Sequence, residues 1–343
     1  MRHTVILFIT FILMVFGNAF AQEIYVDSQH GSDGYTGDLE KPLRSIEKAL
    51  SIANSFTGNG EITIKLNPGV YTLEGRADIN PVRIMTDSTR YIIEAVYMPD
   101  AHDWSQEKMP KIQSTSHNNS DTMFEHSVGF LVSSSYVTLK GLTFLGNANP
   151  AVSYYYPIAK EDSKLGDLEV SQCYFIGNKE AAAIQAGVWA HGPNNTVSHC
   201  IFYECRNGVL FFDNVSGFTI ENSIVANAYE SAFWFGPADI PFTFTNNIIT
   251  NNNNFLVGRS ADLEYSSPFT NSIISNNSGY VGYWSREEKR IVPIAKPNIK
   301  EQSVTKTGEI PLLENSSVKL TKRHLHAAEG STEKSINAGI FRN

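Results

Sequence analysis

The sequence predicts a right-handed parallel β-helix, an all-β stack of three-stranded coils with a short N-terminal capping helix. Two observations predict this fold. A strand–bend–strand unit recurs between residues 137 and 274, and a third strand-like run follows several of its copies. Repeats of a few dozen residues that cannot bury an apolar face alone are typical of solenoids.

The repeating unit places an apolar residue at corresponding positions that are 23 to 31 residues apart: Leu139, Val170, Val197, Ile220, Phe244 and Phe269. Two positions later, each copy carries a bend-forming or polar residue: Gly141, Gln172, His199, Asn222, Asn246 and Asn271. Apolar residues alternate on both sides of this position. Because Gly and Asn tolerate left-handed backbone angles, the pattern predicts two strands that meet at a sharp bend.

The third strand of each coil is predicted at residues 183–189, 208–212, 231–235 and 254–257. Residues 42–53 instead show a helical pattern, with Ile46, Ala49, Leu50 and Ala53 on one face. A solenoid needs a cover over its first coil, so this helix is predicted to cap it. We therefore expect a single domain over residues 22–343, with a cap and first coil over 22–75. An irregular segment that crosses or covers the C-terminal end is expected from about residue 280.

The N-terminus has the layout of a secretory signal peptide. Arg2 precedes an apolar stretch over residues 5–16, and Ala19 and Ala21 form a small-x-small cleavage site. A dozen apolar residues are too few to span a bilayer. We predict cleavage after Ala21 and a secreted or periplasmic protein without a membrane span.

Charge and cysteine content narrow the classes of partner. The formal net charge is −8 and no basic run is present, which argues against nucleic-acid binding. We expect a monomer. Three cysteines are not a disulfide framework. Cys173 and Cys200 occupy matching positions in consecutive coils, so both free thiols and a disulfide remain open.

The N-terminal residues and the repeats together resemble secreted pectin-lyase-like β-helix proteins. The resemblance rests on residues 24–33, then Gly37, residues 41–43 and 62–66, and residues 69–71, followed by the Asn-bend repeats. It covers nearly the whole mature chain. It implies the parallel β-helix fold and a polysaccharide or oligosaccharide partner, although this fold also hosts non-catalytic surface proteins.

The catalytic signatures of this superfamily do not transfer to this chain. Polygalacturonase-type hydrolases carry paired Asp residues and a Gly-His-Gly, whereas this chain has only Ala190-His191-Gly192. Pectate lyases carry calcium-binding acids near an Asp-His pair, and the local string ending at His199 lacks the acid. We therefore expect no cofactor and no metal site, with calcium relevant only if the protein is a lyase.

The sheet of third strands is the expected floor of a ligand site. Catalytic candidates on it or at its edges are His191, Arg206, Asp213, Glu230 and Asp239. Substrate-binding candidates are Tyr154, Tyr155, Gln185, Trp189, Trp234 and Arg259, with Tyr156 beside them. Aromatic faces can stack on sugar rings, and polar groups around them can bind hydroxyls. The two tryptophans can equally fill the solenoid, and each charged residue can equally be a solvated ion pair.

Three functions stay open at this point. A glycoside hydrolase needs two carboxylates, for which Asp213, Glu230 and Asp239 are candidates. A lyase needs a base and a group that neutralises a uronate, for which His191, Arg206 and Arg259 are candidates. A non-catalytic glycan-binding or scaffold protein needs neither. We favour the hydrolase slightly, because a net acidic chain is less suited to a polyanionic substrate.

Overall fold

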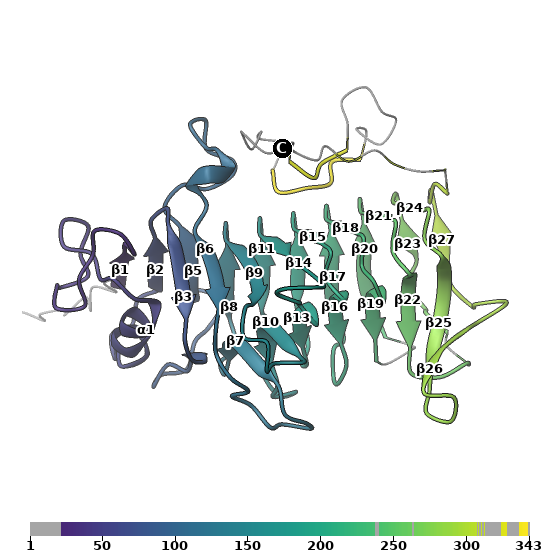
Figure 1. Cartoon of the computed structure of the whole chain (residues 1–343), viewed down its shortest axis with the longest axis horizontal. Coiled ribbons are helices and arrows are strands. Elements are labelled where there is room, and N and C mark those ends of the chain that lie inside the picture. The colour runs from purple at the N-terminus through teal and green to yellow at the C-terminus, as the bar shows by residue number, and fades with distance from the viewer. Residues whose placement is uncertain are drawn as a thin grey trace, which may run out of the picture.

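The structure is a computed structural model that describes residues 22–236, 240–262, 264–306, 308, 310, 312, 324–327 and 336–341. The expected signal peptide and the candidate Asp239 lie outside the described residues. Three sheets run along one elongated solenoid, and successive coils stack from the N-terminal end to the C-terminal end (Figure 1). The predicted three-stranded coils are confirmed.

Each coil contributes one strand to each sheet, and the sheets are named A, B and C. Sheet A holds, in spatial order, β1 (Gln22–Val26), β2 (Ile62–Leu66), β5 (Tyr91–Ala95), β8 (Val137–Lys140), β11 (Glu169–Ser171), β14 (Thr196–Ser198), β17 (Phe218–Glu221), β20 (Phe242–Thr245), β23 (Phe269–Thr270) and β27 (Glu301–Gln302). Sheet B holds β3 (Val70–Leu73), β6 (Lys111–Ser114), β9 (Thr143–Asn147), β12 (Tyr174–Ile176), β15 (Ile201–Tyr203), β18 (Ile224–Ala226), β21 (Ile248–Thr250) and β24 (Ile273–Ser275).

Sheet C forms the third side of the solenoid and is made of the predicted third strands. It holds β4 (Ala77–Ile79), β7 (Ser127–Val132), β10 (Tyr155–Lys160), β13 (Ala186–Ala190), β16 (Asn207–Phe211), β19 (Ser231–Phe235), β22 (Asn254–Gly258), β25 (Gly279–Ser285) and β26 (Arg290–Pro293). Its strands pair in parallel except β25 with β26, which form an antiparallel hairpin.

The bends between sheets A and B form where the repeat predicts them. Gly141, Gln172, His199, Asn222, Asn246 and Asn271 all have positive φ angles, between 40° and 73°. Left-handed backbone is least costly for Gly and Asn, which explains their recurrence at this position. The Asn side chains also bond between coils: the Asn271 amide donates to Oδ1 of Asn246 one coil below.

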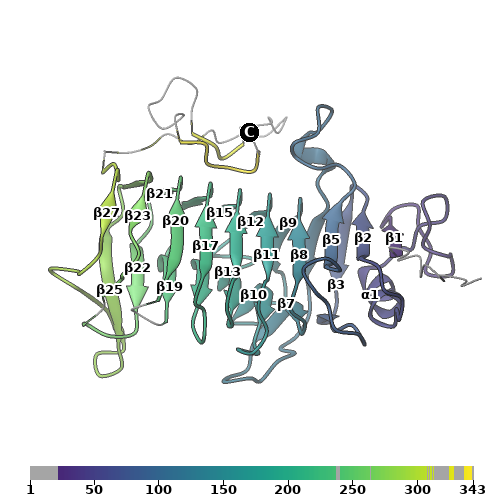
Figure 2. The same ribbon diagram turned by 180° about the vertical axis from the view of Figure 1, so that it is seen from behind.

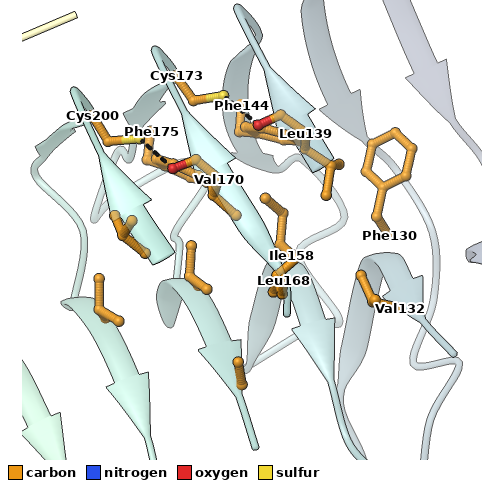
Figure 3. Close-up of a cluster of buried hydrophobic side chains, with 14 of the residues drawn as sticks. Phe130, Val132, Leu139, Phe144, Ile158, Leu168, Val170, Cys173, Phe175 and Cys200 are labelled. Atoms are coloured by element: carbon orange, nitrogen blue, oxygen red, sulfur yellow. Dashed lines mark hydrogen bonds between the residues drawn. The ribbon is translucent and has the colours of Figure 1, made fainter. Parts of the chain in front are cut away.

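The interior of the solenoid is filled by inward-facing rows of stacked side chains. Phe144 and Phe175 stack with ring centroids 4.9 Å apart (Figure 3). Phe202 stacks on Phe175 at 4.5 Å. Cys173 and Cys200 lie beside this row, and their thiols are free and buried, as is that of Cys205. Because side chains of the same kind stack in register from coil to coil, they bury a continuous apolar core. This explains why apolar residues recur at corresponding positions of the repeat.

Helix α1 (Ile46–Asn54) closes the N-terminal end of the described chain. It begins after Ser45, whose side chain accepts a hydrogen bond from the Lys48 amide. Its buried face packs on β1, β2 and β4, as the pattern predicts. A 3₁₀ turn, η1 (Gln106–Lys108), precedes β6. No helix among the described residues is long and apolar enough to cross a membrane.

The segment after residue 280 differs from the expected irregular chain. Its first part is regular, because β25 completes a coil and β26 extends sheet C as a hairpin. Farther on, residues 324–327 and 336–341, here called the C-terminal strap, return along the solenoid rather than over its end (Figures 1 and 2). The strap packs Leu325 and Ile340 on the outer face of sheet B.

Candidate functional site

The outer face of sheet C carries an apolar row that solvent-facing strands normally lack. Strand register aligns Ala159, Trp189, Leu210, Trp234 and Val257 on neighbouring strands. The alternate residues point into the core. Strands with apolar residues on both faces need cover on the outside, from a loop or from a ligand.

Two hollows lie over this row. Hollow 1, of about 400 Å³, is lined by Phe124, Glu125, Tyr154, Tyr156, Gln185, Asn207, Leu210, Phe212, Glu230 and Trp234. Hollow 2, of about 600 Å³, is lined by Met123, Phe124, Phe212, Asp213, Trp234, Gly258, Arg259, Trp284 and Arg286. Both share Phe124, Phe212 and Trp234, so they are two parts of one groove, here called the sheet C groove.

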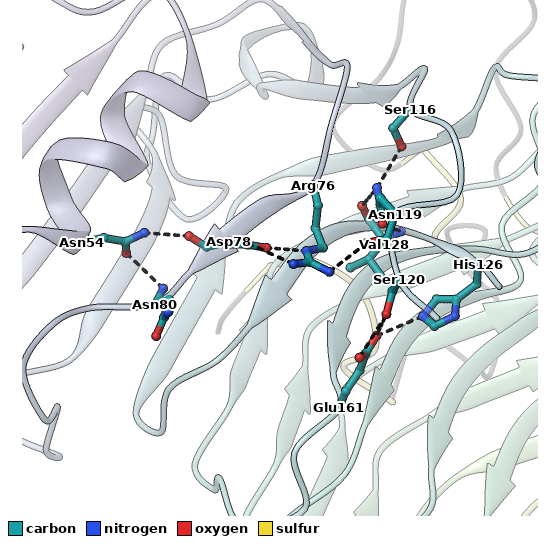
Figure 4. A network of polar contacts seen from close by, with 10 residues as sticks. All are labelled: Asn54, Arg76, Asp78, Asn80, Ser116, Asn119, Ser120, His126, Val128 and Glu161. Atoms are coloured by element: carbon teal, nitrogen blue, oxygen red, sulfur yellow. Dashed lines mark hydrogen bonds and ion pairs between the residues drawn. The ribbon is translucent and has the colours of Figure 1, made fainter. Parts of the chain in front are cut away.

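One wall of the groove is the loop between β6 and β7, residues 115–126. Its base is fixed by hydrogen bonds (Figure 4): Arg76 pairs with Asp78 and donates to the Asn119 carbonyl at 2.8 Å. The Asn119 side chain accepts from the Val128 amide and donates to its carbonyl. The loop therefore stands on a rigid base while its tip reaches over sheet C.

A hydrogen-bonded pair, His126 with Glu161, completes this base. The two ring nitrogens of His126 lie 2.7 Å from the Phe124 carbonyl and 3.0 Å from Oε1 of Glu161. Both partners are hydrogen-bond acceptors, and together they hold the imidazole from both sides. Burial alone raises the pKa of Glu161, but hydrogen bonds from His126, Thr122 and Ser120 outweigh it and leave the pKa below its ordinary value.

A polar cluster lies at hollow 1, along the side of sheet C where its strands begin, here called the N-terminal edge. Arg206 forms an ion pair with Glu230 and donates to Oε1 of Gln185 at 3.3 Å. The Asn207 amide bridges the Gln185 carbonyl and the Glu230 carboxylate. This cluster brings together three of the predicted site residues, Gln185, Arg206 and Glu230, beside an apolar floor.

A second cluster lies at hollow 2, along the opposite side of sheet C where its strands end, here called the C-terminal edge. Arg259 donates to Oδ1 of Asp213 at 2.7 Å and lies over the Phe212 ring. The Asp213 amide donates to Nδ1 of His191. Burial lowers the pKa of His191, and the carboxylate of Asp213 opposes that shift. His191 lines neither hollow, so its position favours a structural role at this turn over the predicted role as a catalytic base.

Asp213 and Glu230, predicted as a carboxylate pair, lie at opposite edges of the sheet. Glu230 precedes β19 and Asp213 follows β16, so a five-residue strand separates them. Such a strand spans roughly 15 Å, whereas glycosidases hold their two carboxyl groups about 5 to 10 Å apart. Residues from neighbouring coils are close only when both lie at the same ends of their strands. The repeat spacing alone did not show at which end each residue lies.

Of the aromatic candidates, some line the groove and others do not. Tyr155 faces the core and is 2 % exposed, so the prediction that it binds substrate is wrong, because strand alternation sends Tyr156 outward in its place. Tyr154 and Trp234 line hollow 1 as expected. Trp189 lies on the outer face but is 2 % exposed beneath other rings.

Several lining residues were not predicted. They come from loop 115–126, from the outward positions of β16 and from the β25–β26 hairpin: Met123, Phe124, Glu125, Asn207, Leu210, Phe212, Trp284 and Arg286. Apolar residues at successive positions 209–212 were the available signal, since a strand with both faces apolar is covered on both sides. The loop residues carry no such signal.

The described residues do not fit a calcium ion. No three or more of their His, Cys, Asp or Glu side chains are grouped so that they could hold a metal ion, and Asp213 is already paired with Arg259. Calcium takes six or more oxygen ligands, several of them carboxylate.

Comparison with known proteins supports the fold. A family profile described as "Right handed beta helix region" matches residues 128–291. No curated protein sequence matches the chain. A solved structure named "Rhamnogalacturonan lyase" is similar, with a TM-score of 0.51 at 13 % identity over 76 % of this chain and 70 % of that one.

Two further solved structures are more distant. A GH136 lacto-N-biosidase from Eubacterium ramulus has a TM-score of 0.45 at 12 % identity, over 85 % of this chain and 68 % of that one. Pectate lyase Pel9A has a TM-score of 0.41 at 17 % identity, over 76 % and 56 %. With its three parallel sheets, Asn bends and matching family profile, the described chain folds as a right-handed parallel β-helix.

Proposed function

We propose that the protein is carbohydrate-active and holds a segment of a polysaccharide in the sheet C groove. The observation that carries this proposal is the aromatic and apolar floor of the groove, where Leu210, Phe212 and Trp234 lie between two polar edges. Sugar rings offer apolar C–H faces and a polar rim of hydroxyls, so they suit a floor of this composition.

The shape of the groove also favours a chain over a single small molecule. Hollows 1 and 2 adjoin along the solenoid and share three aromatic residues, so consecutive sugars can occupy both. The similar structure named "Rhamnogalacturonan lyase" supports the same class of ligand.

Hydrolysis in hollow 1 is the reaction we favour. Two carboxylates, Glu125 and Glu230, line this hollow from the loop tip and from the sheet edge. A glycosidase uses one carboxyl group as the acid and the other as the base or nucleophile. The ion pair with Arg206 holds the Glu230 carboxylate in place at the sheet edge, so we assign it the base or nucleophile and assign Glu125 the acid.

Elimination is the second candidate, and one observation favours it. Arg259 and Arg286 line hollow 2, where they would neutralise a uronate carboxylate. Asp213 is the carboxylate that lines this hollow, and it is already paired with Arg259.

The test is a screen of the protein on pectin, rhamnogalacturonan, xylan, alginate and β-glucan. Reducing ends report hydrolysis, and the absorbance of unsaturated products reports elimination. We expect new reducing ends without unsaturated products, and at least a hundred-fold loss of rate in Glu230→Gln, as for removal of an acid–base group. Glu180→Gln, at an exposed carboxylate that lines neither hollow, serves as the matched control and should retain activity.

Other outcomes of the screen contradict specific parts of the proposal. Unsaturated products lost in Arg259→Ala would replace hydrolysis with elimination. Binding without cleavage would leave a carbohydrate-binding protein. If the protein neither binds nor cleaves any of these polysaccharides, the proposed function is refuted.

A further inference from the structure

The tip of loop 115–126 is an exposed five-residue turn on a closed neck. Ser120 and His126 pair across the neck through backbone hydrogen bonds of 3.0 and 3.1 Å. All of residues 121–125 are exposed, and Met123 has a left-handed backbone with φ of 74°. Exposed turns with few backbone bonds open at low free-energy cost, whereas the bonded neck does not.

Phe124, on this tip, covers Trp189. The two rings are stacked, with centroids 6.3 Å apart and planes 25° apart, and the Tyr154 ring lies edge-on to Phe124 at 5.3 Å. Phe124 is 39 % exposed, while Trp189 beneath it is 2 % exposed. The tip therefore places an exposed aromatic ring over a buried one.

The indole N–H of Trp189 is buried and has no hydrogen-bond partner among the described residues. A buried donor without an acceptor is unfavourable, and such groups are rare in native structures. Trp189 stands in register between Ala159 and Leu210 on the row that forms the groove floor. The floor thus includes an aromatic face and an unused donor that lie beneath Phe124.

Phe124 also interrupts the groove. It lines both hollow 1 and hollow 2, and Trp189 lines neither. If the Phe124 ring rotates away about its side-chain bonds, while its carbonyl stays bonded to His126, the Trp189 face joins the floor. Tyr156, whose ring lies 4.6 Å from Trp189, extends the same platform.

We propose that Trp189 is a sugar-binding subsite of the groove, which Phe124 occupies in the ligand-free protein. The inference rests on the proposed function and deepens it by naming the subsite. A pyranose ring replaces the Phe124 ring on the indole face, and one of its hydroxyl oxygens accepts the hydrogen bond from the indole N–H. A ligand long enough to reach this subsite must displace Phe124, whereas a short ligand need not.

The experiment measures binding to an immobilised panel of oligosaccharides, two to eight sugars long, from xylan, pectin, rhamnogalacturonan, alginate and β-glucan. The wild type is compared with Phe124→Ala, with Phe124→Ala/Trp189→Phe and with Asp121→Ala. The last is the matched control, an exposed residue of the same loop tip. Thermal melting confirms that each variant is folded.

In Phe124→Ala, the longer oligosaccharides should bind tighter, on the order of ten-fold, because the stack on Trp189 no longer has to be displaced. The shortest members should bind unchanged. The gain should disappear in Phe124→Ala/Trp189→Phe, which lacks the indole donor, and Asp121→Ala should match the wild type.

Unchanged or weaker binding of the long members to Phe124→Ala would overturn the inference and make Phe124 a fixed part of the wall. A gain that persists without the Trp189 indole would also overturn it. Absence of binding to every protein in the series is a different result, because it refutes the proposed function and the subsite with it.

Discussion

His126 and Glu161 form a hydrogen bond, with 3.0 Å between Nε2 and Oε1, that joins the neck of loop 115–126 to the end of β10. The His126 side chain is fully buried, and the second ring nitrogen holds the Phe124 carbonyl. This pair fixes the wall of the sheet C groove at its base, and only the tip beyond it is exposed.

Replacing Glu161 by Gln should destabilise the protein. The substitution removes the carboxylate that accepts hydrogen bonds from His126 and Ser120 in a buried site. We expect the free energy of unfolding to fall by about 1 to 3 kcal/mol, measured by urea denaturation. Glu125→Gln, on the exposed tip, should change it by less than about 0.5 kcal/mol. Equal effects of the two variants would show that the pair does not hold the loop.

The contribution of Glu161 should depend on pH. Its pKa in the folded protein is lowered below the ordinary value of 4.5, so its stabilisation is fully present above pH 4.5. As the pH falls through the lowered pKa, the carboxylate takes up a proton and the contribution is lost. The difference in unfolding free energy between the wild type and Glu161→Gln should therefore shrink between pH 7 and pH 3. A constant difference would contradict this assignment.

Lys160 should give a pH dependence of the same sign, but on the alkaline side. Its side chain is fully buried at an inward position of β10, and burial lowers its pKa to about 7 from 10.5. Between these values the unfolded chain binds one more proton, so stability rises with pH by up to about 1.4 kcal/mol per unit. Lys160→Met should remove that slope between pH 7 and pH 10. A slope that persists in the variant would arise elsewhere.

The C-terminal strap should contribute to stability through its contacts with sheet B. Ile340 is fully buried there, and the Gly339 amide donates to the Asn222 carbonyl at 2.8 Å. Ile340→Ala should lower the free energy of unfolding by about 2 to 4 kcal/mol. Ile84→Ala, at a residue that is 90 % exposed, is the matched control. A melting temperature equal to that of the control would mean that the strap does not pack in solution.

The coil architecture follows from local sequence because each bend makes a local demand on its backbone. Asn222, Asn246 and Asn271 were predicted as bends, and each has the left-handed backbone that Asn tolerates. The strap was not predicted, because its contacts join residues more than a hundred positions apart, such as Asn222 and Asn337. No local pattern encodes a contact of that kind.

The candidate site was predictable only at the level of the sheet. Gln185, Arg206 and Glu230 do meet at one edge, because each immediately precedes a strand of sheet C. Asp213 falls at the other edge, because it follows a strand. The loop that carries Phe124 and Glu125 lies on sheet C only through the three-dimensional path of the chain, which its sequence does not reveal.

The central claim is that a polysaccharide lies on the aromatic floor of sheet C, and affinity in Trp234→Ala tests it most directly. Trp234 lines both hollows, so its loss should weaken binding of any polysaccharide identified in the screen at least ten-fold, as for removal of a stacked aromatic contact. Ile84→Ala is the control. Ile84 is highly exposed and lines neither hollow, so this variant should leave the affinity unchanged. Equal affinities of the wild type and Trp234→Ala would contradict the account and place the carbohydrate, if it binds, elsewhere on the solenoid.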